Sequence, residues 1–541
     1  MQFESGSPFD RRTLLKLGSG ATVMGAAFVA GITTSVPARA ETSGGDDGPR
    51  PVRQFRALWI ASVVNIDWPS RTGLDVATQQ AEFEAWLDLA DELNLNAVIS
   101  QVRPTADAFW PSPYEPWSRY LTGSQGVDPG YDVLGFQVEA AHRRNLEYHA
   151  WFNPYRVSMQ TNQADLVADH PAKQHPEWVW AYGGKLYYDP GIPEVRQFVE
   201  DAMMHAVEHY DIDAVHFDDY FYPYPSGGLD YPDAHTYATY GGGVPLADWR
   251  RDNINALVRE MRERIQAVKP WVKFGISPFG IWRNRRTDPR GSDTGGTESY
   301  SAISADSYQW VKQGWVDYIN PQIYWQIGLT VADYAKLVPW WAGVVEGTDV
   351  ALYIGQAVYK NTSGVFTDPQ ELSKHLEFNK DYPQVDGDVF FSAKDVRADV
   401  KNAVSIMVAD HYQSPAIVPV IEHLGGRAPQ APVGVSVVRS GSGVTVRWNK
   451  LPHSHATSFA VWTLRPPRGT HRRPQRPVRS PLSTSTRRPL GPRLPGTTQH
   501  TPPSSRCCDD HWIPPCDPRI ECATGYGAVA VLRPHRLPGL G

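Results

Sequence analysis

The sequence predicts an α/β protein built around a TIM (β/α)8 barrel with long βα-loop insertions. Between Gln54 and about Tyr412, short β-rich runs alternate with helical patterns in eight successive units. The segments that join each strand to its helix are long, as in barrels that carry insertions at the catalytic face. The competing fold is an open doubly wound sheet. No glycine-rich turn follows the first strand, however, and the chain does not divide into two halves.

Each predicted strand is followed by one predicted helix. The strands, in chain order, are Phe55–Asp67, Asn96–Arg103, Glu147–Tyr155, Ala214–Phe221, Lys273–Phe279, Val316–Tyr324, Val350–Tyr359 and Asp388–Ala393. The helices are Thr78–Leu93, Asp132–Asn145, Glu194–Tyr210, Leu246–Val268, Ala305–Gly314, Val331–Val345, Pro369–Asn379 and Asp399–Asp410. A helical crossover after every strand predicts that the strands run parallel.

The composition limits the class of protein. The chain has 541 residues, of which 41% are hydrophobic and 20% are charged, and its formal net charge is −6. These values are globular and exclude a collagen, a coiled coil or a polytopic membrane protein. The length exceeds one ordinary domain, so two or three parts are expected. Residues 463–541 stand apart, with 13 Arg, no Lys, 15 Pro and all four cysteines.

Residues 1–40 resemble a twin-arginine signal peptide. Arg11 and Arg12 precede a glycine-containing apolar run from Leu17 to Val36, and Ala38-Arg39-Ala40 has the form of a cleavage site. The alternative is an uncleaved anchor of marginal length. Twin-arginine cargo folds in a reducing cytoplasm, which agrees with the absence of cysteine from residues 41–462. We expect an exported protein, secreted or cell-wall associated, with no stable membrane insertion once the signal is removed.

The part of the chain between the signal and the tail is strongly acidic. Residues 41–462 hold 52 acidic and 35 basic side chains, a net charge of about −17. Such a charge repels phosphate backbones, so nucleic-acid binding is not expected, whereas a neutral polymer such as a glycan is compatible. Residues 41–53 are predicted to be a linker and residues 54–425 the barrel domain. The sequence gives no indication of oligomeric state.

Residues 430–462 resemble the start of a fibronectin type III domain. Three alternating strands are predicted here, but such a sandwich needs about seven, and alternation stops after Trp462. We interpret residues 463–541 as a disordered tail that results from a shifted reading frame, because Arg and Pro replace Lys and Val. The alternative is a genuine Pro/Arg linker with a small cysteine cluster. The four cysteines match no standard zinc spacing, and we assign them no function.

Five motifs follow or include predicted strands, where the chemistry of a TIM barrel lies. They are FRALWIASVVNIDWPS, AWFNPYR, DAVHFDDYFYPYP, GISPFGIWRN and YINPQIYW. At these residues the chain resembles the glycosyl-hydrolase-like family ten, exported cell-wall proteins with a TIM barrel. The resemblance spans about residues 54–412 and does not reach the tail. It implies glycoside hydrolysis, with peptidoglycan glycan strands as the substrate.

Asp218 and Asp219 are the predicted catalytic residues. Two adjacent carboxylates at a strand end repel each other and raise one pKa, so the protonated member can act as a general acid on a glycosidic oxygen. Perturbed carboxylates also cluster at functional sites. The alternative is that one of the pair is a buried structural residue, bonded to the backbone or to an arginine.

A second carboxylate across the scissile bond is not evident. Ordinary glycosidases place it about 5 Å away, or farther when they invert. The sixth predicted strand offers the neutral Asn320 and Gln322, and the fifth, seventh and eighth offer Ser277, Gln356 and Ser392. A substrate-assisted route, in which a 2-acetamido group attacks its own anomeric carbon, removes this need. By analogy with hexosaminidases of that kind, Asp218 would orient the acetamido N–H and Asp219 would be the acid/base, or the reverse.

The predicted substrate-binding residues are aromatic or polar side chains near strand ends. Aromatic rings stack on the apolar faces of sugars, and polar groups bind hydroxyls or carboxylates. The alternatives are aromatic core packing, which is expected for about half of the aromatics, and salt-bridged barrel residues. The set is Asp67, Trp68, Arg103, Asn153, Tyr155, Arg156, Tyr220, Tyr222, Trp282, Asn284, Asn320, Gln322, Tyr324 and Trp325.

We predict no cofactor and no metal site. His205 and His209 are four residues apart on a predicted helix, but the glutamate of an HExxH motif is missing. A metal-dependent polysaccharide deacetylase, which needs one Asp and two His, is disfavoured because His142, His149 and His216 are scattered along the chain. The sequence therefore favours an exported glycoside hydrolase. The alternative is a non-catalytic glycan-binding cell-wall protein, in which the aromatics bind and the Asp pair is structural.

Overall fold

The computed structural model describes residues 52–425, 433–440, 443–449, 459–463, 520–523 and 528–532. The predicted signal peptide, residues 1–40, lies outside these ranges. Within the ranges described, no helix is long and apolar enough to cross a membrane.

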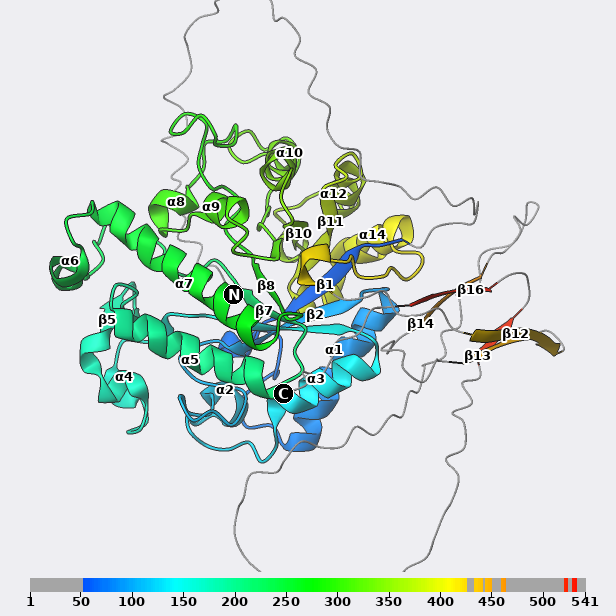
Figure 1. Cartoon of the computed structure of the whole chain (residues 1–541), viewed down its shortest axis with the longest axis horizontal. Helices are drawn as coiled ribbons and strands as arrows, with labels where there is room; N and C mark the ends of the chain where they lie inside the picture. The colour runs from blue at the N-terminus through cyan, green and yellow to red at the C-terminus, as the bar shows by residue number, and fades with distance from the viewer. Residues whose placement is uncertain are drawn as a thin grey trace, which may run out of the picture. The chain divides into compact units, whose positions relative to one another are not determined.

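Eight parallel strands close into a barrel, as the sequence predicts (Figure 1). Neighbouring strands pair in the order β1, β2, β3, β7, β8, β9, β10, β11 and back to β1. Their bounds are Phe55–Ile60 (β1), Ala97–Arg103 (β2), Glu147–Phe152 (β3), Ala214–Phe217 (β7), Lys273–Ile276 (β8), Tyr318–Ile319 (β9), Ala351–Ala357 (β10) and Val385–Phe391 (β11). Almost every strand residue is buried, because one side chain faces the barrel interior and the next faces the helices.

Helices follow the strands and cover the outside of the barrel, with α1 beside α3 and α5 beside α7 (Figure 1). Several begin at a capping aspartate; Asp75, for example, accepts a hydrogen bond from the backbone N–H of Thr78 at the start of α1. The helices are Val76–Glu92 (α1), Arg119–Thr122 (α2), Val133–Arg143 (α3), Pro171–Gln174 (α4), Pro193–His209 (α5), Ala234–Tyr240 (α6), Leu246–Val268 (α7), Ser299–Ala302 (α8), Ser307–Lys312 (α9), Tyr334–Val345 (α10), Tyr359–Thr362 (α11), Glu371–Asn379 (α12), Ala393–Ala398 (α13) and Ala403–His411 (α14).

Most of the strands end earlier than their sequence pattern predicts. The first was predicted to continue to Asp67, but β1 ends at Ile60. There the chain turns back, because Asp67 accepts a hydrogen bond from the backbone N–H of Ala61 at 2.8 Å and its own N–H donates to the Ala61 carbonyl. The apolar residues that follow Ile60 therefore belong to the loop at the carboxyl end of the strand.

The loop after β3 contains a small antiparallel sheet that the sequence pattern does not predict. Its strands are β4 (Arg156–Ser158), β6 (Lys185–Tyr188) and β5 (Val179–Tyr182), paired in that order. Strands of three or four residues are too short to show alternation. The sheet is one of the long βα insertions expected at the catalytic face.

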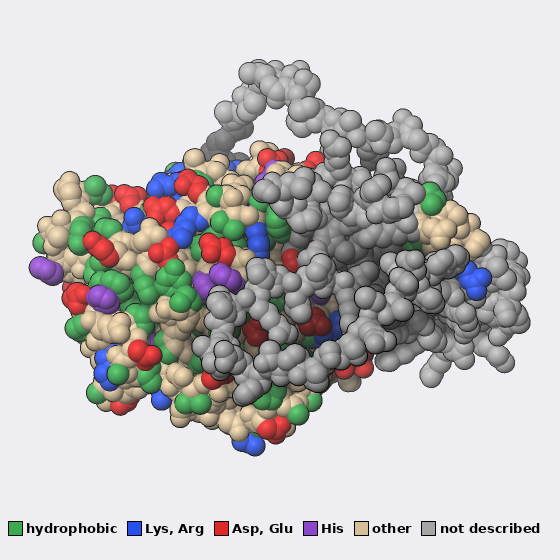
Figure 2. Space-filling model, turned by 60° about the horizontal axis from the view of Figure 1, so that its bottom comes forward, with side chains coloured by type: hydrophobic (Ala, Val, Ile, Leu, Met, Phe, Trp, Pro, Cys, Tyr) green, Lys and Arg blue, Asp and Glu red, His purple; other side chains and the backbone are tan. Residues whose placement is uncertain are grey.

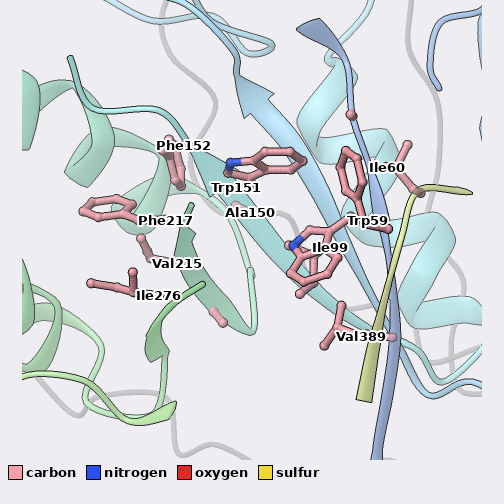
Figure 3. Packing of buried hydrophobic residues seen from close by; sticks show 14 of the residues in the cluster. Trp59, Ile60, Ile99, Ala150, Trp151, Phe152, Val215, Phe217, Ile276 and Val389 are labelled. Carbon is pink, nitrogen blue, oxygen red and sulfur yellow. The ribbon is translucent and has the colours of Figure 1, made fainter. Parts of the chain in front are cut away.

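The barrel interior is filled by aromatic and histidine rings rather than by aliphatic side chains. Phe55 stacks on Tyr353 with ring centroids 4.2 Å apart. The hydroxyl of Tyr318 is hydrogen-bonded to Nδ1 of His149 at 3.0 Å and to Nδ1 of His216 at 2.9 Å. Figure 3 shows Trp59 from β1 and Trp151 from β3 among residues of neighbouring strands; the centroids of their rings lie 6.0 and 6.5 Å from that of His216.

A glycine makes room for the Tyr318 ring. A Cβ added to Gly275 of β8 would lie 2.0 Å from that ring. We expect Gly275→Ala to lower the free energy of unfolding by about 1–3 kcal/mol, because the interior is already close-packed. Chemical denaturation measures the change. Gly343→Ala is the control: this glycine of α10 has nothing within 4 Å of its added Cβ, so the variant should match the wild type or exceed it by about 0.5–1 kcal/mol. Equal stability of the two variants would contradict the packing argument.

Among the residues that the structure describes after the barrel domain, five strands occur. β12 (Val433–Ser440) and β13 (Gly443–Asn449) form an antiparallel pair, and β14 (Phe459–Thr463) follows, near the three predicted strands of the fibronectin-like segment. β15 (Ile520–Ala523) pairs with β13, and β16 (Ala528–Leu532) pairs with β14. The remainder of the predicted tail, and with it the frame-shift interpretation, lies outside the described residues.

Candidate active site

Asp218 and Asp219 directly follow β7, at the carboxyl end of the barrel, and both are buried. Three N–H groups donate to Asp218. The indole of Trp151 donates to Oδ2 at 3.0 Å, the side-chain amide of Asn153 donates to the same atom at 2.5 Å, and the backbone N–H of Tyr220 donates to Oδ1 at 3.0 Å. These N–H groups donate hydrogen bonds and cannot accept one from a protonated carboxyl group. They therefore favour the ionised form of Asp218.

The orientation of Asn153 is fixed by its neighbours on the preceding strands. Its Oδ1 accepts hydrogen bonds from Gln101 at 2.6 Å and from Arg156 at 2.9 Å, which leaves its amide N–H for Asp218. Gln101 is in turn held by the backbone N–H groups of Ser62 and Val63. A continuous line of hydrogen bonds therefore runs from the end of β1 through β2 and β3 to Asp218.

Asp219 has a different kind of donor. The hydroxyl of Tyr224 donates to Oδ2, and the side-chain amide of Gln322 donates to Oδ1 at 3.0 Å. Gln322 also donates to the carbonyl of Ser277 at 2.9 Å, which fixes the side chain between β8 and β9. A hydroxyl can reverse its hydrogen bond and accept, so this environment tolerates a protonated Asp219 as well as an ionised one.

The two carboxyl groups have raised pKa values. Burial raises both, and the nearby charge of Asp219 raises the pKa of Asp218 further, to about 7. Groups that interact this strongly titrate as a pair, so the proton belongs to the pair and the hydrogen bonds decide where it resides. The reversible hydroxyl of Tyr224 allows Asp219 to hold that proton.

We expect kcat/KM for glycan hydrolysis to fall as the pH rises above about 7, because the raised pKa keeps the shared proton on the pair only up to that pH. The rate of formation of new reducing ends from pH 5 to 9 measures this. Tyr224→Phe removes a hydrogen bond that lowers the pKa of Asp219, so it should move the fall to higher pH. A profile that is flat to pH 9 in the wild type would show that no proton of this pair is needed.

Four half-buried aromatic rings form a wall beside the pair. The ring centroids of Trp325 and Phe279 are 5.4 Å apart, those of Phe279 and Tyr224 are 6.2 Å apart, and those of Tyr224 and Tyr220 are 5.9 Å apart. Unlike most aromatics of the barrel, these rings keep part of their surface exposed. We call them the aromatic wall; its partly exposed faces can stack on sugar rings.

Several of the predicted binding residues are structural instead. Four aromatics have at most 1% exposed surface and pack within the core, so they cannot present a face to a sugar in this structure: Trp68, Tyr155, Tyr222 and Trp282. The indoles of the two tryptophans bond inside the protein, to the carbonyl of Gln79 and to Asp306. The physical reason is that large rings next to strand ends still gain more from burial than from exposure.

The polar residues divide in the same way. Arg103 is fully buried in an ion pair with Glu115, and Asn284 bonds to Glu298 and to the carbonyl of Gly296, which braces a loop. Asp67 accepts hydrogen bonds from Ala61, Ser392 and Lys394. These three residues hold loops in place and do not contact the pair through any of these bonds.

The structure does bring the other predicted residues to the site. Asn153 and Gln322 bond directly to the pair, Arg156 bonds to Asn153 and lies over the ring of Tyr220, and Tyr220 and Trp325 belong to the aromatic wall. Tyr324 is close enough to Asp219 for the carboxylate charge to raise its pKa.

Asn320 is buried at the end of β9, and neither atom of its amide has a partner among the described residues. Such a group is costly unless something binds it. Asn320 is two residues after Tyr318, so strand alternation places both side chains in the barrel interior, with Asn320 nearer the carboxyl ends of the strands.

Trp151, Tyr224 and Gln101 are outside the predicted catalytic and binding set although they organise the pair. The signal for Gln101 was a polar residue inside a predicted strand, next to Ser100, and Trp151 lies two residues before Asn153 on the same face. Hydrogen bonds between strands that are distant in sequence cannot be assigned from the pattern alone.

The described residues contain no group of three or more His, Cys, Asp or Glu side chains arranged to hold a metal ion. His205 and His209 stack on each other, and His205 accepts a hydrogen bond from the indole of Trp110. On the surface, acidic side chains are spread widely over the visible face of the described body (Figure 2). That distribution fits the acidic composition.

The glycosyl hydrolase-like 10 family model matches residues 54–373. The chain belongs to this family. Over 417 residues it is 48% identical to the glycosyl hydrolase YngK of Bacillus subtilis (strain 168), covering 76% of this chain and 82% of that protein. Over 363 residues it is 40% identical to the glycosyl hydrolase DigH of Escherichia coli (strain K12), covering 62% and 82%. Membership of the family and the buried carboxyl pair both support a glycosidase.

Proposed function

We propose that the protein is an exported glycoside hydrolase that cleaves peptidoglycan glycan strands or a related N-acetylated polysaccharide. The observation that carries the proposal is the buried pair after β7, with Asp218 held by three N–H donors and Asp219 by a reversible hydroxyl. The residues that follow β8 and β9 nearest to the pair are neutral: Gln322 bonds to Asp219 and to the carbonyl of Ser277, and Asn320 is a buried amide. Substrate assistance fits this arrangement, because the sugar itself then supplies the nucleophile.

In the proposed reaction Asp219 donates its proton to the glycosidic oxygen while the bond from that oxygen to the anomeric carbon breaks. The carbonyl oxygen of the 2-acetamido group forms the new bond to the anomeric carbon, and the carboxylate of Asp218 accepts a hydrogen bond from the acetamido N–H. Water then attacks the same carbon and gives a proton to Asp219. The acid is restored and the anomeric configuration is retained.

Other features support a polymeric sugar as the substrate. The aromatic wall consists of four rings in successive contact, from Trp325 to Tyr220. A wall of that length can stack on more than one sugar ring. The unpartnered amide of Asn320 offers both a donor and an acceptor. The twin-arginine-like residues 1–40 support export to the compartment where cell-wall glycans are found.

The test is incubation of the purified protein with peptide-free peptidoglycan glycan strands, followed by mass spectrometry of the products. New reducing ends on N-acetylated sugars are expected. The matched control is the same glycan after chemical removal of the N-acetyl groups, which should resist cleavage because its sugars lack the internal nucleophile. Equal cleavage of both glycans would refute substrate assistance. Retention of the glycan without products would instead indicate a non-catalytic glycan-binding protein.

A further inference from the structure

Lys360 is a half-buried cation on the catalytic side of the barrel. It is the second residue of α11, which follows the carboxyl end of β10. Its ammonium group donates to the carbonyl of Tyr324 and lies 6.0 Å from the ring centroid of Trp325 and 5.9 Å from that of Phe366. It thus meets one backbone acceptor and two aromatic rings.

Among the described residues, no carboxylate pairs with the ammonium of Lys360 to offset the cost of burying its charge. The pKa of Lys360 is lowered to about 8 by burial alone, without an opposing contribution from an acidic neighbour. Lys273, which is also largely buried, forms an ion pair with Glu147 at 2.5 Å. A buried ammonium is costly unless an anion faces it, so the missing partner of Lys360 is expected outside the protein.

The position of Lys360 connects it to the acid pair. The neighbouring Tyr359 is close enough to Asp219 for the carboxylate charge to raise its pKa. Gln322, which binds Asp219, is also bridged to Gly355 of β10. The cation therefore lies along the same edge of the barrel as the pair, beside Trp325 at the end of the aromatic wall.

We propose that Lys360 binds a carboxylate carried by the sugar that packs against Trp325, so that the preferred substrate is an acidic N-acetylated glycan. This inference rests on the proposed function and narrows its substrate class. The ammonium has two further N–H groups to offer a carboxylate, and charge-assisted hydrogen bonds are strong in a partly buried site. A carboxylate joined to the sugar by a short ether substituent has the required chemistry.

The test compares two forms of one glycan. Peptide-free peptidoglycan strands carry a free lactyl carboxylate on alternate sugars, and methyl esterification removes that charge while it preserves the sugars. For the carboxylate form, we expect Lys360→Met to lower kcat/KM about 10- to 100-fold. For the ester form, wild type and variant should be equal within about two-fold. Lys360→Arg should recover most of the lost activity, because it restores the positive charge.

Lys380→Met is the matched control, because Lys380 is an exposed residue directly after α12, and it should match the wild type on both glycans. An equal loss on both forms in Lys360→Met, or no loss on either, would overturn the proposal, and thermal unfolding identifies a variant that has not folded. If the wild type releases no reducing ends from either form, the proposed function fails instead. Equilibrium binding of the two glycans to the wild type and to Lys360→Met then decides about Lys360, and equal affinities would overturn it.

Discussion

Asp219→Asn is expected to lower kcat for hydrolysis of an N-acetylated glycan by about 10³-fold, the contribution typical of a general acid. The asparagine keeps the shape of the side chain and its bond to Gln322 but has no proton to give. The loss should be much smaller on a substrate with a good leaving group such as nitrophenolate, because that group departs without protonation.

Asp218→Asn provides the matched comparison. If Asp218 orients the acetamido group, its loss impairs formation of the bond to the anomeric carbon and slows both kinds of substrate equally. Asp349→Asn, at an exposed position, should have no effect. A good leaving group that rescues Asp218→Asn and not Asp219→Asn would mean that the two roles are reversed.

Asp219→Asn should also be more stable than the wild type at pH 8. The pKa of Asp219 is raised in the folded state by burial, so the folded protein loses stability as the pH rises above the unfolded pKa and the buried group ionises. The difference in the free energy of unfolding should therefore shrink towards pH 4. Greater stability without activity is the pattern expected of a carboxyl group that is retained for chemistry.

Glu115→Gln is expected to lower the free energy of unfolding by about 3–5 kcal/mol, because it leaves the buried guanidinium of Arg103 without its counter-charge. Both side chains are completely buried, and two hydrogen bonds join them at 2.7 and 2.5 Å. Arg103 also donates to the carbonyls of Asn153 and Pro154. The variant should therefore disturb the loop that positions Asn153 against Asp218, and reduce activity as well.

Denaturant unfolding at pH 7 measures the change in stability. The control is Glu377→Gln, which breaks an exposed ion pair with Lys380 and should cost no more than about 0.5 kcal/mol. A loss below about 1 kcal/mol in Glu115→Gln would show that the buried pair is not needed for stability. Arg103 would then be open again to a role in binding substrate.

The barrel was predictable because its signal is local and repeated. Strand and helix patterns alternate eight times, and each pattern is set by side chains within one element. The small sheet after β3 was not predictable, since strands of three or four residues leave no periodic signal. Strand ends were misplaced for a similar reason: the turn after β1 depends on a bond from Ala61 to Asp67, and the apolar pattern does not record it.

For the site, the sequence by itself determined which carboxylates are the catalytic candidates. Two adjacent aspartates after a barrel strand must lie at its carboxyl end, where burial and mutual repulsion perturb them. Only the tertiary structure decided what surrounds them. Whether an aromatic or an arginine near a strand end stays partly exposed, as Trp325 does, or is buried in the core, as Trp282 and Arg103 are, depends on contacts between segments far apart in the chain. The sequence contains both kinds of residue in the same pattern, and packing separates them.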